Sequence, residues 1–112
     1  MKSIKTKLPK EKDIQLEICR YLESRGYFFW RQNTSPIFDK TTGFYRPMPK
    51  YSVKGLPDII LIREGGLFVG LEVKRPGSKP SDNQISFKEK CEGVGAEYHI
   101  VRSVEDVIAL GL

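Results

Sequence analysis

Two carboxylates and a lysine stand at the ends of two predicted strands. Asp58 begins an apolar run over 58–62, and Glu72 and Lys74 lie at the end of a second run over 67–74. Because a Gly-Gly turn joins these runs, they predict an antiparallel hairpin. Pairing across that turn joins residues whose numbers sum to about 130, which places Asp58 opposite Glu72. The spacing predicts two acids side by side at one end of a sheet.

The chemistry of such a pair depends on what lies between the acids. Glu72 and Lys74 share one face of their strand, and Leu71 and Val73 share the other. Two adjacent carboxylates repel each other unless a cation separates them, and a hard divalent ion held by oxygen ligands is the usual solution. The alternative is a structural Glu–Lys pair, with Asp58 as the start of a turn.

A predicted helix over 11–25, ended by Gly26, contributes a further acid. Its apolar stripe consists of Ile14, Ile18, Tyr21 and Leu22. Glu11 falls in line with this stripe, where an acid needs a partner, and a site at the end of the sheet would supply one. Acids also favour helix starts through the macrodipole. Glu17, on the other edge of the stripe, is the alternative candidate.

The remaining segments complete one α/β domain in the order α-β-β-β-α-β-α. They predict a strand over 27–30, a long loop over 31–54 that can contain a hairpin, a helix from Ser81 or Asp82 to about 92, a strand over 98–101 and a helix over 103–110. Gln84 lies in the first turn of the second helix. It either makes a capping contact with the backbone or reaches a phosphate or Lys74.

The composition sets the class of protein. A chain of 112 residues, 39% hydrophobic and 11% aromatic, fits a single folded domain, and no apolar stretch approaches the roughly 20 residues of a membrane span. The N-terminus lacks the apolar segment of a secretory signal. Cys19 and Cys91 predict reduced thiols in a cytosolic setting. His99, alone on a predicted strand, favours a structural role.

The net charge of +5 is unevenly distributed. Residues 1–12 carry five lysines against Glu11, and residues 31–54 carry five cations against Asp39, so each segment is +4 and the remainder is −3. A polyanion is the natural partner for basic segments. The aromatics within 31–54, on which bases could stack, are Phe38, Phe44, Tyr45 and Tyr51. The alternative is a solvated loop whose aromatics pack on the body.

Together these motifs resemble a nuclease family. They are Gly55-Leu56-Pro57-Asp58, Glu72-Val73-Lys74, Gln84 with Phe87, the opening Glu11-x-x-Ile14-Gln15 and the closing Val101-x-Ser103-x-Glu105-Asp106. The chain resembles the PD-(D/E)xK superfamily, and within it the virus-type replication–repair nuclease (VRR-NUC) domain, over about residues 11 to 107. The resemblance implies a restriction-endonuclease-like αβββαβ core with a mixed sheet flanked by helices, formed by residues 11–112 after a basic tail over 1–10.

The resemblance also implies metal-dependent hydrolysis of phosphodiester bonds in DNA. Asp58 and Glu72 would bind Mg²⁺, or Mn²⁺ in its place, with Glu11 and the carbonyl of Val73 as further ligands. Lys74 would stabilise developing charge or orient the attacking water, and Gln84 would be a positioning residue. The cations expected to contact DNA are Arg31, Lys40, Arg46, Lys50, Lys54 and Arg75.

Short members of the family, often encoded by phages, resemble homodimeric endonucleases of repair and recombination that cut branched DNA. The resemblance therefore implies a Holliday junction resolvase in the cytoplasm of a bacterial or phage-infected cell, associated with the nucleoid and not with a membrane. A flap or restriction-like nuclease and a noncatalytic DNA-binding module are the alternatives.

Overall fold

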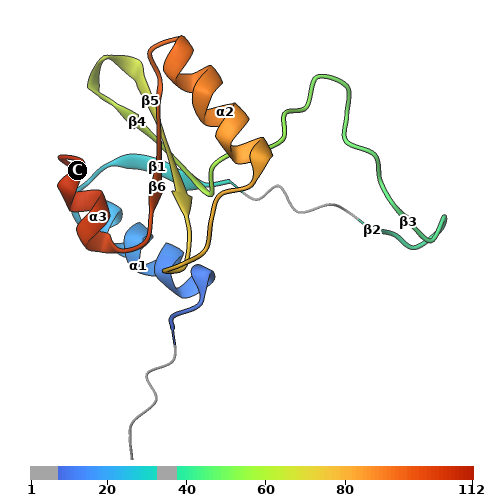
Figure 1. Ribbon diagram of the computed structural model, residues 1–112, viewed down its shortest axis with the longest axis horizontal. Helices are drawn as coiled ribbons and strands as arrows, with labels where there is room; N and C mark the ends of the chain where they lie inside the picture. The colour runs from blue at the N-terminus through green and yellow to red at the C-terminus, as the bar shows by residue number, and fades with distance from the viewer. Residues whose placement is uncertain (1–7, 33–37) are drawn as a thin grey trace, which may run out of the picture.

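A four-stranded mixed sheet forms the centre of the molecule (Figure 1). The computed structural model describes residues 8–32 and 38–112. The strands of the sheet, in spatial order, are β1 (Phe28–Arg31), β4 (Ile59–Arg63), β5 (Leu67–Val73) and β6 (Glu97–Val101). The first three pair antiparallel, whereas β5 and β6 are parallel. A parallel pair needs a long crossover, and the helix between β5 and β6 supplies it. The predicted fold class is confirmed.

Helices cover both faces of this sheet. The elements are α1 (Glu11–Ser24), α2 (Asp82–Gly93) and α3 (Val104–Ala109). The buried stripe of α1 packs with α3 on one face, against Leu61 and Leu71 among other strand residues. On the other face α2 packs against β6, where the rings of Phe87 and Tyr98 lie 5.6 Å apart. The α1 stripe is buried because its apolar residues recur at the helical period.

Local capping explains where the two later helices begin. Ser81 caps α2 through a capping box with Gln84, and Ser103 accepts a hydrogen bond of 3.1 Å from the amide of Asp106 at the start of α3. Such side chains satisfy amide groups that have no partner within the helix. All of the helices and strands that the sequence predicts are present. The turn between β4 and β5 is a short 3-10 segment, η1 (Glu64–Gly66).

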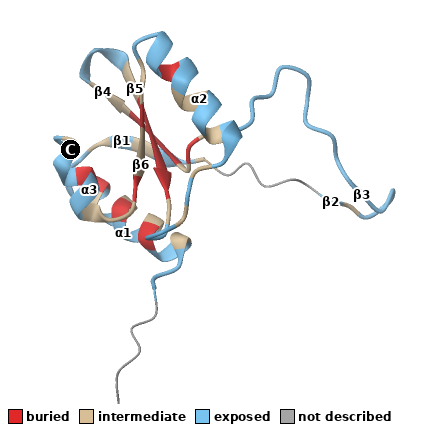
Figure 2. Ribbon diagram, viewed as in Figure 1, coloured by how far each residue is buried: buried red, intermediate tan, exposed pale blue. Residues whose placement is uncertain are grey.

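Between β1 and β4 the chain forms a hairpin that projects away from the body (Figure 1). Its strands, β2 (Phe38–Asp39) and β3 (Phe44–Tyr45), pair only with each other. We call residues 38–54 the arm. Figure 2 shows the arm as almost entirely exposed, so the alternative in which its aromatics pack on the body is wrong. Lys2, Lys5 and Lys7 of the predicted basic tail lie outside the described residues.

The cysteines are free thiols, as the sequence predicts. Cys91 is buried on α2 and Cys19 is half-buried on α1. Burial raises the pKa of both thiols, which keeps them protonated and unreactive at neutral pH. Within residues 8–32 and 38–112, no helix has the length and apolarity required to cross a membrane.

Candidate active site

The register of β4 and β5 brings the two predicted acids together. Ile59 pairs with Leu71, so the next pair outward in the same register is Asp58 and Glu72. Asp58 Oδ2 accepts a hydrogen bond of 2.8 Å from the amide of Val73, which fixes the Asp58 carboxyl against the end of β5. The carboxyl groups of Asp58 and Glu72 lie close enough to form a hydrogen bond with each other. Two carboxyl groups can share such a bond only when one of them carries a proton.

Glu72 is buried in an unusual way for an acid. It is 2% exposed, and it is the one buried charged side chain in the part of the chain that the structure describes. Burial, the hydrogen bond and the charge of Asp58 raise the pKa of Glu72 to about 9, and the charge of Lys74 acts in the opposite direction. Without a bound cation, Glu72 therefore holds a proton at neutral pH. A divalent ion would replace that proton and neutralise both carboxylates.

The structure distinguishes between Glu11 and Glu17, the two acids of α1 that are candidates for the site. Glu11 is half-buried at the start of the helix, and its negative charge contributes to the raised pKa of Glu72. Glu17 is exposed almost two turns further along the same helix. Among the described residues, no three His, Cys, Asp or Glu side chains lie close enough together to hold a metal ion. Glu11 is thus near the carboxylate pair without forming a third ligand in this arrangement.

The donors that the site offers fit a hard cation. Asp58 and Glu72 supply carboxylate oxygens, which Mg²⁺ and Mn²⁺ prefer. The N–H of Val73 points to the side of β5 on which Asp58 lies. The N–H and C=O of one residue in an extended strand point to the same side, so the carbonyl of Val73 faces that side as well. The buried, proton-bearing Glu72 is the observation that favours a cation here.

Lys74 follows β5 on the same face as Glu72. Leu71 and Val73 belong to the core that packs on α1, so the alternating side chains of Glu72 and Lys74 point to the opposite face. Lys74 is half-buried, and its amide donates to the carbonyl of Val101 at 3.0 Å, which continues the pairing of β5 with β6. No carboxylate of the described segments lies within ion-pair distance of its ammonium group. The Lys74 charge is therefore available to a substrate.

Gln84 makes a capping contact, which is one of the two roles that the sequence predicts for it. Its side-chain oxygen accepts a hydrogen bond of 2.8 Å from the amide of Ser81, and its own amide donates to Ser81 Oγ at 3.3 Å. The first turn of α2 nevertheless lies against the segment that leads to Asp58. A Cβ added to Gly55 would collide with the carbonyl of Asn83. Gln84 thus caps the helix whose first turn lies beside this segment, and a direct contact with substrate stays a prediction.

Tyr98 is a residue that the sequence argument did not identify. Its hydroxyl donates to the carbonyl of Gly55 at 3.3 Å, and a Cβ on Gly70 would overlap Pro57 and stand 3.3 Å from the Tyr98 ring. Burial and the charges of Glu72 and Asp58 raise the pKa of the Tyr98 hydroxyl. The ring thus supports the backbone that carries Asp58. Gly70 inside a strand was the available signal, because such a glycine indicates a close approach by another group.

The predicted DNA contacts fall into two groups. Arg31 lies at the end of β1 and donates from Nε and Nη2 to Gln15 Oε1 at 3.2 and 3.1 Å. Arg75 is exposed just after Lys74, and its carbonyl accepts a bond of 2.6 Å from Arg102. The other predicted contacts, Lys40, Arg46, Lys50 and Lys54, are all exposed on the arm. Arg31 and Arg75 thus lie on the body, at the end of β1 and just beyond β5, and the other four lie along the arm.

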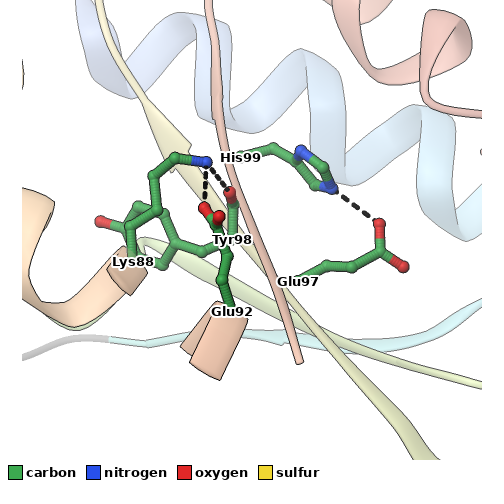
Figure 3. Close-up of polar contacts among 5 residues, drawn as sticks. All are labelled: Lys88, Glu92, Glu97, Tyr98 and His99. Atoms are coloured by element: carbon green, nitrogen blue, oxygen red, sulfur yellow. Dashed lines mark hydrogen bonds and ion pairs between the residues drawn. The ribbon is translucent and has the colours of Figure 1, made fainter. Parts of the chain in front are cut away.

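Figure 3 shows polar contacts on the edge strand β6. Lys88 of α2 donates to the carbonyl of Tyr98 at 3.0 Å and pairs with Glu92 at 2.7 Å. His99 Nε2 lies 2.8 Å from Glu97 Oε1. A lysine that occupies a carbonyl of an edge strand hinders pairing with another chain. His99 thus has a polar partner on its own strand, and its structural role stays a prediction.

Comparison with known proteins tests the fold. No protein-family model matches the sequence, and no curated protein matches it at a significant level. A solved structure described as a VRR_NUC domain aligns with 89% of this chain and 91% of its own, with a TM-score of 0.63 and 23% sequence identity. The chain has the fold of a VRR_NUC domain. The VRR_NUC fold confirms the predicted resemblance in architecture, including the mixed sheet and its flanking helices.

Proposed function

We propose that this chain is a metal-dependent nuclease that hydrolyses phosphodiester bonds in DNA. The observation that carries the proposal is the buried Glu72, adjacent to Asp58 at the end of two paired strands, with a raised pKa of about 9. A domain that only binds DNA gains nothing from a buried acid that repels phosphates. An enzyme gains a site that a divalent cation completes. The VRR_NUC fold also supports a nuclease function.

The residues of the chain have distinct parts in this proposal. Asp58 and Glu72 would hold Mg²⁺ or Mn²⁺, with the Val73 carbonyl as a further oxygen donor. The bound ion would supply polarisation of the scissile phosphate and a lower pKa for an attacking water. The Val73 amide keeps the Asp58 carboxylate in place through its 2.8 Å hydrogen bond. Lys74 would stabilise the negative charge that develops on the phosphate.

Within this activity, we propose branched DNA as the substrate and a homodimer as the active form, as in resolution of a four-way junction. Support for a dimer comes from β1, which is an edge strand with two exposed aromatic rings. Phe28 is 68% exposed and Trp30 39% exposed, with ring centroids 5.6 Å apart. Exposed aromatics beside an unpaired strand edge favour contact with another chain. A two-fold dimer would present two sites symmetrically to a junction.

A cleavage assay tests the proposal. Labelled four-way junction, flap, splayed-arm and plain duplex DNA are incubated with Mg²⁺, Mn²⁺ or EDTA. We expect cleavage of the junction with either ion and none in EDTA. Asp58→Asn should lower the rate by about 10³-fold or more while DNA binding is retained, because it removes a metal ligand and no cation. Glu17→Gln, on the exposed side of α1, is the matched control and should cut normally.

Two results would contradict the proposal. Cleavage in EDTA at the rate seen with Mg²⁺ would exclude a metal-dependent reaction, and Asp58→Asn cutting at the wild-type rate would exclude the carboxylate pair. Preference for flap or duplex DNA would replace the junction as substrate and leave the nuclease proposal intact.

A further inference from the structure

The arm leaves and rejoins the body beside the carboxylate pair. Gln32, the residue after β1, donates its amide to the carbonyl of Asp58 at 2.8 Å. The chain returns at Gly55, where the first turn of α2 packs against it, and reaches Asp58 three residues later. A ligand held at the base of the arm would therefore lie close to the candidate active site.

The arm exposes large apolar side chains that the body does not cover. Tyr51 is 89% exposed and Phe44 73% exposed. The exposed apolar residues of the arm are Phe38, Phe44, Tyr45, Met48, Tyr51 and Val53. Figure 2 shows the arm extended away from the sheet, with no covering element. Exposed apolar surface concentrated on one segment indicates a binding surface.

Contacts within the arm organise its tip and fix the rings of Phe38 and Tyr45 against each other. Asp39 organises the tip, because its Oδ1 accepts from the Thr41 amide and its carbonyl from the Gly43 amide, both at 2.9 Å. Phe38 and Tyr45 meet edge to face at 5.3 Å. Tyr51 is the one non-glycine residue of the described segments with a positive φ, at 69°. An arm organised before binding loses less conformational entropy when a ligand is bound.

Charge selects the class of ligand. The arm carries four cations against Asp39, and Arg46 is 3.9 Å from that carboxylate. Lys40, Lys50 and Lys54 have no ion-pair partner in the described part of the chain. A ligand that is both anionic and rich in flat apolar rings matches this surface, and single-stranded DNA is such a ligand. In a duplex, stacking hides the faces of the bases that the rings would contact.

We propose that the arm, residues 38–54, binds unpaired nucleotides of the DNA substrate. Bases stack on Phe44, Tyr45 and Tyr51, and the lysines contact the neighbouring phosphates. This inference rests on the proposed nuclease function and adds that, within branched DNA, the nucleotides that unpair at the branch point are the ones that the arm binds. The chain between Tyr45 and Gly55 spans at most about 35 Å, which equals the rise of about ten base pairs. The unpaired segment must therefore lie within about ten nucleotides of the carboxylates.

Binding in EDTA separates this proposal from cleavage. Labelled single-stranded and duplex oligonucleotides of about 12 nucleotides, which match the reach of the arm, are titrated with protein and followed by fluorescence anisotropy. Wild-type protein should bind the single strand more tightly. The triple variant Phe44→Ala, Tyr45→Ala, Tyr51→Ala should lose single-strand affinity by about tenfold per ring and keep its duplex affinity. The double variant Tyr45→Phe, Tyr51→Phe keeps the rings and should bind as wild type.

Two outcomes would overturn the proposal. In one, the triple alanine variant binds single strands as tightly as wild type. In the other, sedimentation shows that it changes from dimer to monomer, which would assign the rings to a contact with a second copy of the chain. If the triple alanine variant binds single strands as tightly as wild type and still cuts DNA with Mg²⁺, base stacking on the arm is excluded and the proposed nuclease activity is retained. Circular dichroism verifies that the body stays folded.

Discussion

At the end of the sheet, Glu72 is buried and its neighbour Asp58 is held by a backbone amide, whereas on the arm four cations and several aromatic rings are exposed to water. Glu72 is 2% exposed and Tyr51 is 89% exposed, although both belong to regions that we expect to meet the same DNA. The buried site achieves strong electrostatics by excluding water. The arm offers a binding surface that is already exposed, so no packed side chain has to be uncovered before a ligand binds. Reaction chemistry and recognition therefore impose opposite demands on burial within one small domain.

Two glycines with similar backbone angles test how rigid each region is. Gly55 has φ +84° and Gly43 φ +73°. A Cβ on Gly55 would collide with Asn83, whereas nothing lies within 4 Å of one on Gly43. We expect Gly55→Ala to lower the free energy of unfolding by about 3 kcal/mol or more, from strain and overlap together.

Gly43→Ala is the matched variant on the arm. Its strain is confined to a hairpin that makes no contribution to the core, so global stability should be unchanged within about 0.5 kcal/mol. Urea unfolding measures both variants. Equal losses of stability would show that the arm and the site unfold as one cooperative unit, which would contradict the proposed difference in rigidity between them.

The buried acid should make stability depend on pH in the absence of metal. Glu72 has a pKa of about 9 when folded and an ordinary value near 4.5 when unfolded. Between these values the folded state binds one proton more than the unfolded state, so stability should fall as the pH rises from 5 towards 9.

Glu72→Gln carries no such proton, and its stability should vary less over that range. Urea unfolding in EDTA at several pH values compares the two proteins. A wild-type protein whose stability rises with pH between 5 and 8, relative to Glu72→Gln, would contradict the burial argument.

The exposed cations of the arm should act through phosphates. Neutralising Lys40, Arg46, Lys50 and Lys54 together should weaken DNA binding at low salt and reduce the slope of log affinity against log salt by about 3. Lys90, exposed on α2, provides a control in Lys90→Ala, which should keep the slope within about 1 of wild type. An unchanged slope in the quadruple variant would exclude the arm as the contact surface.

The hydroxyl of Tyr98 should have the smallest effect. Tyr98→Phe removes the 3.3 Å hydrogen bond to Gly55 and keeps the ring. We expect stability to fall by about 1 kcal/mol and kcat to fall severalfold with little change in KM, because the backbone before Asp58 loosens. A change in KM alone would indicate that Tyr98 acts on DNA binding instead.

Local patterns predicted more of the fold than of the site. The hairpin arithmetic placed Asp58 opposite Glu72 because a short turn fixes the register of both strands. Ser81 and Ser103 cap the helices that their positions predicted. Tyr98 was missed because its bond to Gly55 joins residues 43 positions apart. The sequence of the arm did not indicate whether its rings have partners in the body, since that depends on where the hairpin points.

The central claim is that Asp58 and Glu72 together bind a divalent cation, and calorimetric titration with Mn²⁺ tests it most directly. We predict one site per chain in the wild-type protein, with affinity that increases with pH as the proton on Glu72 is displaced. Asp58→Asn and Glu72→Gln should each lose this binding, and Glu17→Gln should retain it. Undiminished Mn²⁺ binding in the Asp58→Asn, Glu72→Gln double variant would contradict the account.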